Sequence, residues 1–474
     1  MKAATDLPIG VQRVYVDNLL DNAPLKPTQL IVFAICALVA LLDGMDSQSI
    51  GVAGPVMAAD LHLKMSHFTP ALSAGLLGAT IGALAFGGLA DRFGRKPVLV
   101  ASTALFGLFT LLTATSSTFS GLLLLRFIAG LGLGGATPCF ITLAAEFSPS
   151  QHRPAISSLI WATFPLGNAL GGFTSGYIVS QFRWQMVFLV AGVPTVVLAL
   201  FMALALPESL RYLVARQRHP ARAERIARRL EPSLSAGPFQ LLARRAEDLL
   251  PDAALRQRTS LVSSMFALFS DQRAVGTLLI WLILYLGLGT TTVMVLMSPT
   301  LLHSDGIKLG MTGALVGVFS ISSMLSMAIA GRLIQIVGPA LALSPAFLIG
   351  AAFIVILGHL HSPLLLGLCM MIIGLSAPLG VAGGIALAAT FYPIHIRSSG
   401  VGWGMGFGRF GQVCSPLVIG LMLSLSWEPI KILTAMAAAP FLAGLAIACF
   451  SWSVRIKTPG TPVPVLPNEL SESL

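Results

Sequence analysis

The chain has 474 residues, of which 55% are hydrophobic and 10% are charged, and its formal net charge is +10. Soluble domains carry about 25% charged residues, so the composition excludes an ordinary soluble protein. The apolar stretches are too long and too numerous for barrel strands, which need only about ten residues. The sequence therefore predicts an all-α polytopic membrane protein.

The positive charge has to be located before a partner is assigned to it. Most of the 29 Lys and Arg residues fall on one side of the membrane if both termini are cytoplasmic, as the positive-inside rule requires. Membrane topology and lipids therefore account for the charge, and no nucleic acid partner is expected. The predicted spans are 28–57, 70–90, 98–117, 120–145, 156–180, 184–207, 274–302, 310–332, 339–358, 362–391, 398–424 and 431–453.

Residues 1–27 read as a retained cytoplasmic tail, because they carry both signs of charge and lack an apolar core with a cleavage site. The cysteines all lie inside apolar runs and not in loops, so we expect no disulfide framework, no metal site and no cofactor. These cysteines are Cys36, Cys139, Cys369, Cys414 and Cys449.

Two carboxylates, Asp43 and Asp46, stand in the middle of the first span. Asp43 lies about 20 Å into a hydrocarbon core about 30 Å thick. The spacing of three residues puts both acids on one side of a helix, where they should face a bundle interior or an aqueous cavity. Gly44, which lies between them, is expected to loosen the helix, because glycine disfavours a helix interior. We interpret the pair as a functional site.

A tight basic turn follows the second span, with Asp91, Arg92 and Arg95 after Gly87 and Gly88. This turn resembles the loop signature of the major facilitator superfamily between its second and third helices. The fourth span then contains Arg126 near its outer end and Glu146 near its inner end. Glu146 is about 30 Å from Arg126 along the helix, so it is expected to serve an inner gate and not the central site.

The polar stretch 208–273 is predicted to be a cytoplasmic linker with short amphipathic helices resting near the inner leaflet. It separates two six-helix bundles, 28–207 and 274–453, and residues 454–474 form a cytoplasmic tail. A shift of 244 residues aligns Gly87 with Gly331 and Arg153 with Arg397. The constant offset predicts two pseudo-symmetric repeats with the site between them.

Each membrane charge occurs in one half only. The same shift places Gly287 opposite Asp43, Met370 opposite Arg126, and Pro165 opposite Arg409. The first half therefore offers carboxylates and Arg126, and the second offers Arg409. This asymmetry suggests a carboxylate substrate held by Arg409 and coupled to protonation of Asp43 or Asp46.

Beyond the superfamily, the chain resembles the aromatic acid:proton symporter family. The motifs are Asp43-Gly44-Met45-Asp46, the run from Arg126 to Pro149, and Arg397 with Gly402-Trp403-Gly404 and Gly408-Arg409. The resemblance implies proton-driven uptake of small aromatic carboxylates such as 4-hydroxybenzoate, protocatechuate or benzoate across a bacterial inner membrane. One departure is Gln335, where the second-half turn usually has an acid.

The resulting hypothesis is transport by alternating access, with a functional monomer and no enzymatic activity. Arg409 and Arg126 would bind the carboxylate through their N–H donors. Desolvation and mutual repulsion would favour a proton on Asp43 or Asp46. The candidates for ring stacking are Phe33, Trp161, Phe164, Trp403 and Phe407, and those for an inner gate of charge pairs are Asp91, Arg92, Arg95, Glu146, Arg153 and Arg397.

Other functions remain open. A drug/proton antiporter would share the fold and a first-helix acid, but it would favour cations or neutral lipophiles as substrates. The arginines within the membrane argue against such substrates. A sugar porter would need more cavity Asn and Gln. A transporter with an added aromatic-acid sensing role would signal through the linker or tails. The sequence contains none of the signature motifs considered for an intramembrane enzyme.

Overall fold

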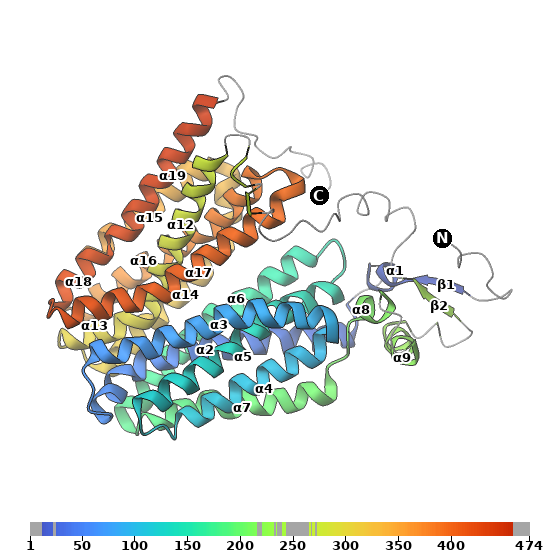
Figure 1. The fold of residues 1–474 in the computed structure, drawn as a ribbon, viewed down its shortest axis with the longest axis horizontal. Coiled ribbons are helices and arrows are strands. Elements are labelled where there is room, and N and C mark those ends of the chain that lie inside the picture. The colour runs from blue at the N-terminus through green and yellow to red at the C-terminus, as the bar shows by residue number, and fades with distance from the viewer. Residues whose placement is uncertain are drawn as a thin grey trace.

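A computed structural model describes residues 12–21, 25–215, 220–231, 234, 239–242, 265–266, 268–270 and 273–457. Nearly all of these residues are helical, and the long helices form two bundles (Figure 1). A small group of short elements lies at one end of the bundles (Figure 1). That group contains parts of the linker, so we call this end the linker side and the opposite end the far side.

The first half contains six long helices. They are α2 (Pro27–Asp60), α3 (Met65–Phe93), α4 (Arg95–Thr113), α5 (Phe119–Phe147), α6 (Arg153–Gln181) and α7 (Gln185–Ala205). Gly94 separates α3 from α4 with φ of 110°, a conformation that residues with a Cβ rarely adopt. The glycine therefore allows the chain to reverse within one residue on the linker side.

The second half repeats these helices. Its elements are α12 (Ala274–Thr292), η3 (Val293–Met297), α13 (Ser298–Ser304), α14 (Leu309–Val337), α15 (Pro339–Leu357), α16 (Pro363–Phe391), α17 (Ile394–Ser424), α18 (Pro429–Met436) and α19 (Ala438–Lys457). Adding 244 to the bounds of α3, α4 and α5 gives the bounds of α14, α15 and α16. The predicted fold of two pseudo-symmetric six-helix halves is confirmed.

Two of the predicted spans are not single α-helices. The span 274–302 contains the π-helical turn η3 between α12 and α13, and the last span is divided between α18 and α19. By length and composition, ten helical segments of the described chain are suited to cross a membrane. The helices α6 and α15 occupy the two remaining positions of the repeat.

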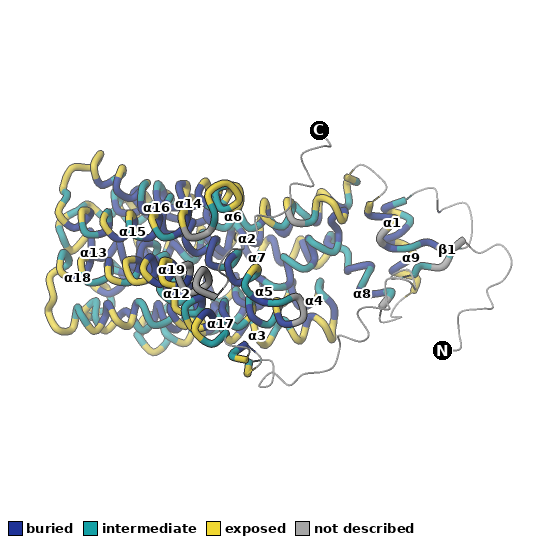
Figure 2. Tube along the Cα trace, turned by 90° about the horizontal axis from the view of Figure 1, so that it is seen from above, coloured by how far each residue is buried: buried dark blue, intermediate teal, exposed yellow. Residues whose placement is uncertain are grey.

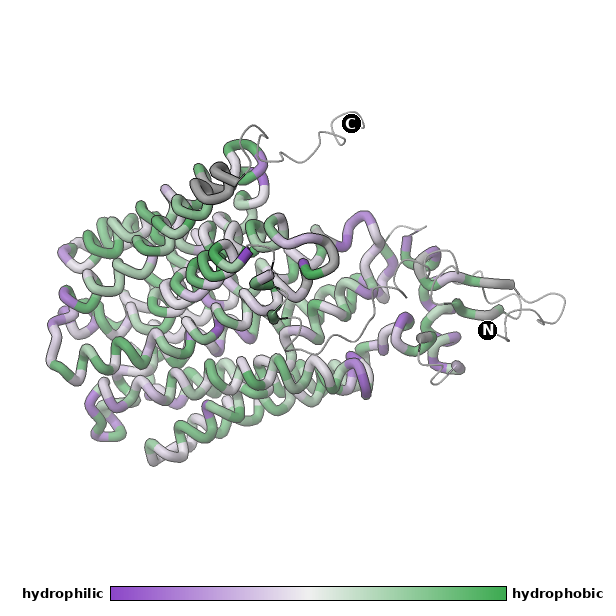
Figure 3. The backbone as a smooth tube through the Cα atoms, turned by 45° about the horizontal axis from the view of Figure 1, so that its top comes forward, coloured by the Kyte–Doolittle hydropathy of each residue, from purple (hydrophilic) through white to green (hydrophobic). Residues whose placement is uncertain are grey.

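The outer surface of the bundles is apolar. Leu204, Leu84 and Leu364 are 88%, 78% and 73% exposed. Figure 2 shows exposed positions along the outer turns and ends of the helices, and Figure 3 shows apolar residues along the bundles with hydrophilic ones near the helix ends. Such exposed leucines suit a hydrocarbon solvent.

The halves pack together through α6 against α14 and α3 against α17. Small residues allow the close approach: a Cβ on Gly176 would lie 2.8 Å from the carbonyl oxygen of Gly310. Gln48 Nε2 donates to the carbonyl oxygen of Val295 at 3.1 Å, and Ser73 Oγ donates to that of Val413 at 2.9 Å. All these contacts belong to the far-side parts of their helices.

The N-terminal tail and the linker fold together. Strand β1 (Gln12–Tyr15) pairs in parallel with β2 (Phe239–Leu242). Helices α1 (Val16–Asp21), α8 (Leu210–Ala215) and α9 (Pro220–Leu230) pack beside them through an apolar cluster. We call these five elements the tail–linker group. Its buried cluster comprises Val16, Leu20, Leu210, Tyr212, Leu213, Ala223, Ile226 and Leu230.

This packing gives the apolar face of one predicted linker helix, α9, a partner within the protein. The apolar face of α9 is covered by protein, since Ala223, Ile226 and Leu230 are buried against the tail. Lys26 Nζ lies 2.9 Å from Glu231 Oε2 and ties the start of α2 to the end of α9. The linker residues 243–264, which include part of the second predicted amphipathic segment, lie outside the described part of the chain.

Candidate functional site

Both acids of the first long helix lie inside the protein. Asp43 and Asp46 are each 4% exposed, on the same continuous helix α2. Gly44 does not loosen this helix, as the sequence had suggested. A Cβ there would overlap the carbonyl oxygen of Phe164 and lie 2.9 Å from the backbone nitrogen of Asn168, so the glycine lets α6 pack directly on the acid-bearing turn.

Asp46 is the partner of Arg126. The Nη1 atom of Arg126 is 3.3 Å from Asp46 Oδ2, and both side chains are almost fully buried. Thr110 Oγ1 donates to Asp46 Oδ1 at 3.0 Å. The guanidinium carbon of Arg126 also lies 5.1 Å from the centroid of the Phe188 ring. Arg126 therefore does not extend toward the membrane surface; α2, α4, α5 and α7 enclose it.

A different arginine lies within electrostatic range of Asp43. This is Arg409, which comes from α17 in the second half. Ser47 Oγ donates to Asp43 Oδ1 at a long 3.4 Å. Arg409 Nη1 in turn donates to the carbonyl oxygen of Ala79 on α3, also at 3.4 Å. The two candidate arginines are thus separated: one is enclosed within the first half, and the other lies where the halves meet.

The predicted aromatic residues form one group in each half. In the first half, Trp161 stacks on Phe164 with ring centroids 5.7 Å apart. In the second half, Phe407 stacks on Trp281 at 5.1 Å, and Trp403 lies 6.5 Å from the same ring. Phe33 is half buried and packs against the apolar core of the first half.

Sequence reasoning missed Trp281 and Tyr285. Tyr285 lies 5.5 Å from Phe407, and Trp281 stacks on Phe407 and Trp403. Their spacing of four residues on α12 was the available signal, because it puts both rings on one helix face. The Nε1 atom of Trp281 is buried and has no hydrogen-bond partner among the described residues.

A second charged cluster lies on the linker side. Arg95 is 3.0 Å from Asp91 and 3.4 Å from Glu146. Sequence reasoning missed its fourth member, Glu208. The Oε1 atom of Glu208 accepts hydrogen bonds from the backbone N–H groups of Arg95, Lys96 and Ser209 at 2.9–3.1 Å. Glu208 therefore satisfies the free donors at the start of α4.

The other predicted gate residues lie apart from this cluster. The backbone carbonyl of Arg92 accepts from Tyr212 Oη at 2.9 Å, and Arg397 Nε donates to the carbonyl oxygen of Tyr392 at 3.4 Å. Arg153 Nε is buried without a hydrogen-bond partner in the described chain. The ion pairs of this cluster, Arg95 with Asp91 and Arg95 with Glu146, both lie within the first half.

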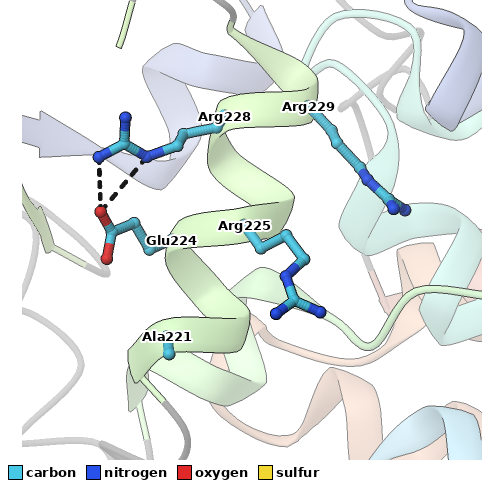
Figure 4. A pocket seen from close by; sticks show the side chains of 5 residues that line it. All are labelled: Ala221, Glu224, Arg225, Arg228 and Arg229. Carbon is cyan, nitrogen blue, oxygen red and sulfur yellow. Dashed lines mark hydrogen bonds and ion pairs between the residues drawn. The ribbon is translucent and has the colours of Figure 1, made fainter. Parts of the chain in front are cut away.

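An arginine-rich surface lies on α9 of the tail–linker group and not in the bundles. Figure 4 shows its shallow depression, with Glu224 paired to Arg228 through a 2.7 Å contact. The lining residues are Ala221, Glu224, Arg225, Arg228 and Arg229. This surface is separate from the acids of α2.

Two six-helix repeats with buried charges between and within them define a secondary membrane transporter. The family model of the Major Facilitator Superfamily matches residues 36–299. The chain is 34% identical to the 4-hydroxybenzoate transporter PcaK of Pseudomonas aeruginosa over 92% of its own length and 96% of that protein. It is 30% identical to the gallate transporter of Pseudomonas putida, over 98% of this chain and 100% of the relative.

Among solved structures, the chain resembles the inward open conformation of the xylose transporter XylE from E. coli. The TM-score is 0.70 at 17% identity, covering 92% of this chain and 98% of that one. The chain belongs to the major facilitator superfamily, and within it to the group of aromatic acid transporters that these relatives represent. It is a transporter and not an enzyme.

Proposed function

We propose that this protein takes up small aromatic carboxylates together with protons by alternating access. The observation that carries the proposal is the interaction of Asp43 in the first half with Arg409 in the second. An acid of one half and an arginine of the other thus lie within electrostatic range of each other, in the parts that must move. The relatives that transport 4-hydroxybenzoate and gallate support an aromatic carboxylate as the substrate class.

Arg409 binds the substrate carboxylate through its fork of N–H donors, which matches a carboxylate in shape and charge. The single long bond of Arg409 to the Ala79 carbonyl leaves most of these donors for a ligand. The buried Nε1–H of Trp281 offers a further donor in the same half. The ring would stack on the aromatic group of Trp281, Trp403, Tyr285 and Phe407, or on Trp161 and Phe164.

The acid pair couples the proton. Moving an ionised carboxylate through an apolar interior is costly, so protonation of the pair lowers the cost of the conformational change. A proton from the outside binds the pair before or with the anion and leaves to the inside after the halves have rocked. Arg126, which we first expected to help bind the substrate, neutralises Asp46 in this arrangement.

We propose that the linker side faces the cytoplasm of a bacterial cell, with both termini there. The support is the distribution of Lys and Arg. Contacts between the halves lie toward the far side, so the arrangement corresponds to an inward-open state, like that of its structural relative. In the opposite state, Asp91, Arg92, Arg95, Glu146, Arg153 and Arg397 would approach across the inner end, and a single chain would suffice for transport.

The test is uptake of labelled aromatic acids into proteoliposomes containing the purified protein. An inward proton gradient should drive accumulation of at least one acid, and a protonophore should abolish it. The Arg409→Gln variant should abolish uptake of the same acid. Exchange of a cationic or neutral compound against protons, with no movement of any aromatic acid, would replace the proposal by a drug/proton antiporter.

A further inference from the structure

A closed network of side chains surrounds Asp46 and Arg126. Thr110 Oγ1 donates to Asp46 Oδ1 at 3.0 Å and accepts from Arg126 Nη2 at 3.2 Å. Arg126 Nη1 donates to Asp46 Oδ2 at 3.3 Å, and Arg126 Nε donates to Thr113 Oγ1 at 3.2 Å. Thr113 Oγ1 donates its own proton to the carbonyl oxygen of Phe109 at 2.8 Å. Every nitrogen of the guanidinium group therefore has a partner.

The network is removed from solvent. Thr110 and Thr113 are fully buried, and Asp46 and Arg126 are 4% exposed. An ion pair so placed is stable only when further hydrogen bonds satisfy both charges, because burial removes their hydration. Thr110 fulfils this need at both charges, since one hydroxyl can donate once and accept as well.

Asp43 lacks such support. Within the described residues, its one side-chain hydrogen bond comes from Ser47 at 3.4 Å. The charged groups that act on it are Asp46 on its own helix and Arg409 on α17. Among the helices packed on α2, α5 brings Arg126 to Asp46, and α6 packs Gly167 and Asn168 against the backbone of the acid-bearing region.

We propose that Thr110 and Thr113 are positioning residues that hold Asp46 and Arg126 as a lasting ion pair, so that Asp43 alone carries the transported proton. This inference rests on the proposed function, which assigned proton coupling to the two acids together and did not say which of them binds the proton. Asp46 is held by the guanidinium group of Arg126 and the hydroxyl group of Thr110, whereas Asp43 has one long side-chain hydrogen bond, from Ser47.

The first experiment compares four variants in α4. Thr110→Val keeps the shape but removes both hydroxyl bonds, and Thr110→Ser keeps them. Thr103→Val is the matched control, because Thr103 is equally buried but bonds only to the Leu99 carbonyl of its own helix. Uptake is measured against external pH at saturating substrate.

Thr110→Val removes one hydrogen bond from each partner of the Asp46–Arg126 pair. The acidic limb of the uptake profile should therefore move up by about one pH unit in this variant. Thr110→Ser should restore the wild-type limb, and Thr103→Val should not move it. Thr113→Val, which loses only the bond from Arg126 Nε, should shift it less. Equal profiles for Thr110→Val and Thr103→Val would overturn the proposal.

A second measurement does not depend on transport. Infrared difference spectra of the purified protein report the carbonyl band of a protonated carboxyl group as the pH is lowered. Asp43→Asn should remove the band that the wild type shows, and Asp46→Asn should leave it. In Thr110→Val a second band should appear. Loss of the band in Asp46→Asn would refute the proposal that Asp43 alone binds the transported proton, even if no aromatic acid were transported. Failed uptake by the wild type alone would count against the proposed function instead.

Discussion

The guanidinium group of Arg409 reaches across from the second half and donates to the backbone carbonyl of Ala79 in the first, at 3.4 Å. A cation of one repeat thus lies on the backbone of the other, beside the acid Asp43. This contact must change when the halves move. A ligand that binds Arg409 therefore acts directly on the equilibrium between the states.

Replacement of Arg409 tests the anion site. Arg409→Lys keeps the charge but loses the planar fork, so we expect KM for the transported aromatic acid to rise about tenfold. Concentration-dependent uptake in proteoliposomes measures it. Arg183→Lys, an exposed far-side position, serves as the control and should leave KM unchanged. An unchanged KM in Arg409→Lys would mean that another group binds the carboxylate.

Asp46→Asn should reduce stability, because it leaves the buried charge of Arg126 unpaired. Breaking a buried pair at one partner costs about 3–5 kcal/mol. Thermal unfolding in detergent should show a lower midpoint for this variant and a partial recovery in the Asp46→Asn, Arg126→Gln double variant. If the double variant is less stable than the single one, the ion pair does not explain the loss.

Gly44→Ala tests the packing behind the acid-bearing turn. The added methyl group would overlap the Phe164 carbonyl, so α6 would have to move away from α2. Overpacking of this kind costs about 1–3 kcal/mol, and we expect a lower unfolding temperature together with slower uptake. Gly87→Ala is the matched control, since no atom lies within 4 Å of a Cβ at that helical position. Similar effects at both sites would exclude the packing explanation.

Glu208 should make stability depend on pH. Burial raises the pKa of Glu208 above its ordinary 4.5, although backbone N–H groups of Ser209, Lys96 and Arg95 oppose the shift. The folded protein therefore holds this proton more tightly than the unfolded chain does. Its contribution to stability is present below pH 4.5 and is lost as the pH rises through the raised pKa.

Glu208→Gln cannot ionise but keeps an acceptor for the start of α4. Its unfolding midpoint should fall less than that of the wild type as the pH rises above about 4.5. Glu208→Ala loses the cap and should be less stable by about 1 kcal/mol at every pH. Glu224→Gln, at an exposed position on α9, is the control. Parallel pH curves for Glu208→Gln and the wild type would contradict this role.

The tail–linker group should come apart when a charge is placed in its core. Val16 is fully buried, so Val16→Asp should expose the apolar face of α9 and speed limited proteolysis of the linker by about tenfold or more. Asn18→Asp introduces the same residue at an exposed position of the same helix and should have no effect. Equal cleavage rates for the two variants would show that the tail does not protect the linker.

Composition and the offset of 244 residues were enough to predict the fold, because the lipid environment admits few solutions for long apolar segments. The same offset identified Asp43, Asp46, Arg126 and Arg409 as charges without a counterpart in the other repeat. Because burying a charge in a membrane span is costly, charged residues are rare there and can be recognised as functional candidates from a single sequence. The tight basic turn after the second span was likewise visible as a motif, and the structure places Gly94 at its reversal.

The partners of these charges were decided by the tertiary structure. Spacing along α2 put both acids on one side of a helix, but the rotation of neighbouring helices sends Asp46 to Arg126 and Asp43 toward Arg409. The threonines of α4 and the cap formed by Glu208 had no sequence signal, since their partners on other helices lie 13 to 113 residues away. Hydropathy and periodicity describe one helix at a time, whereas a side chain is paired by helices that meet only in the folded bundle.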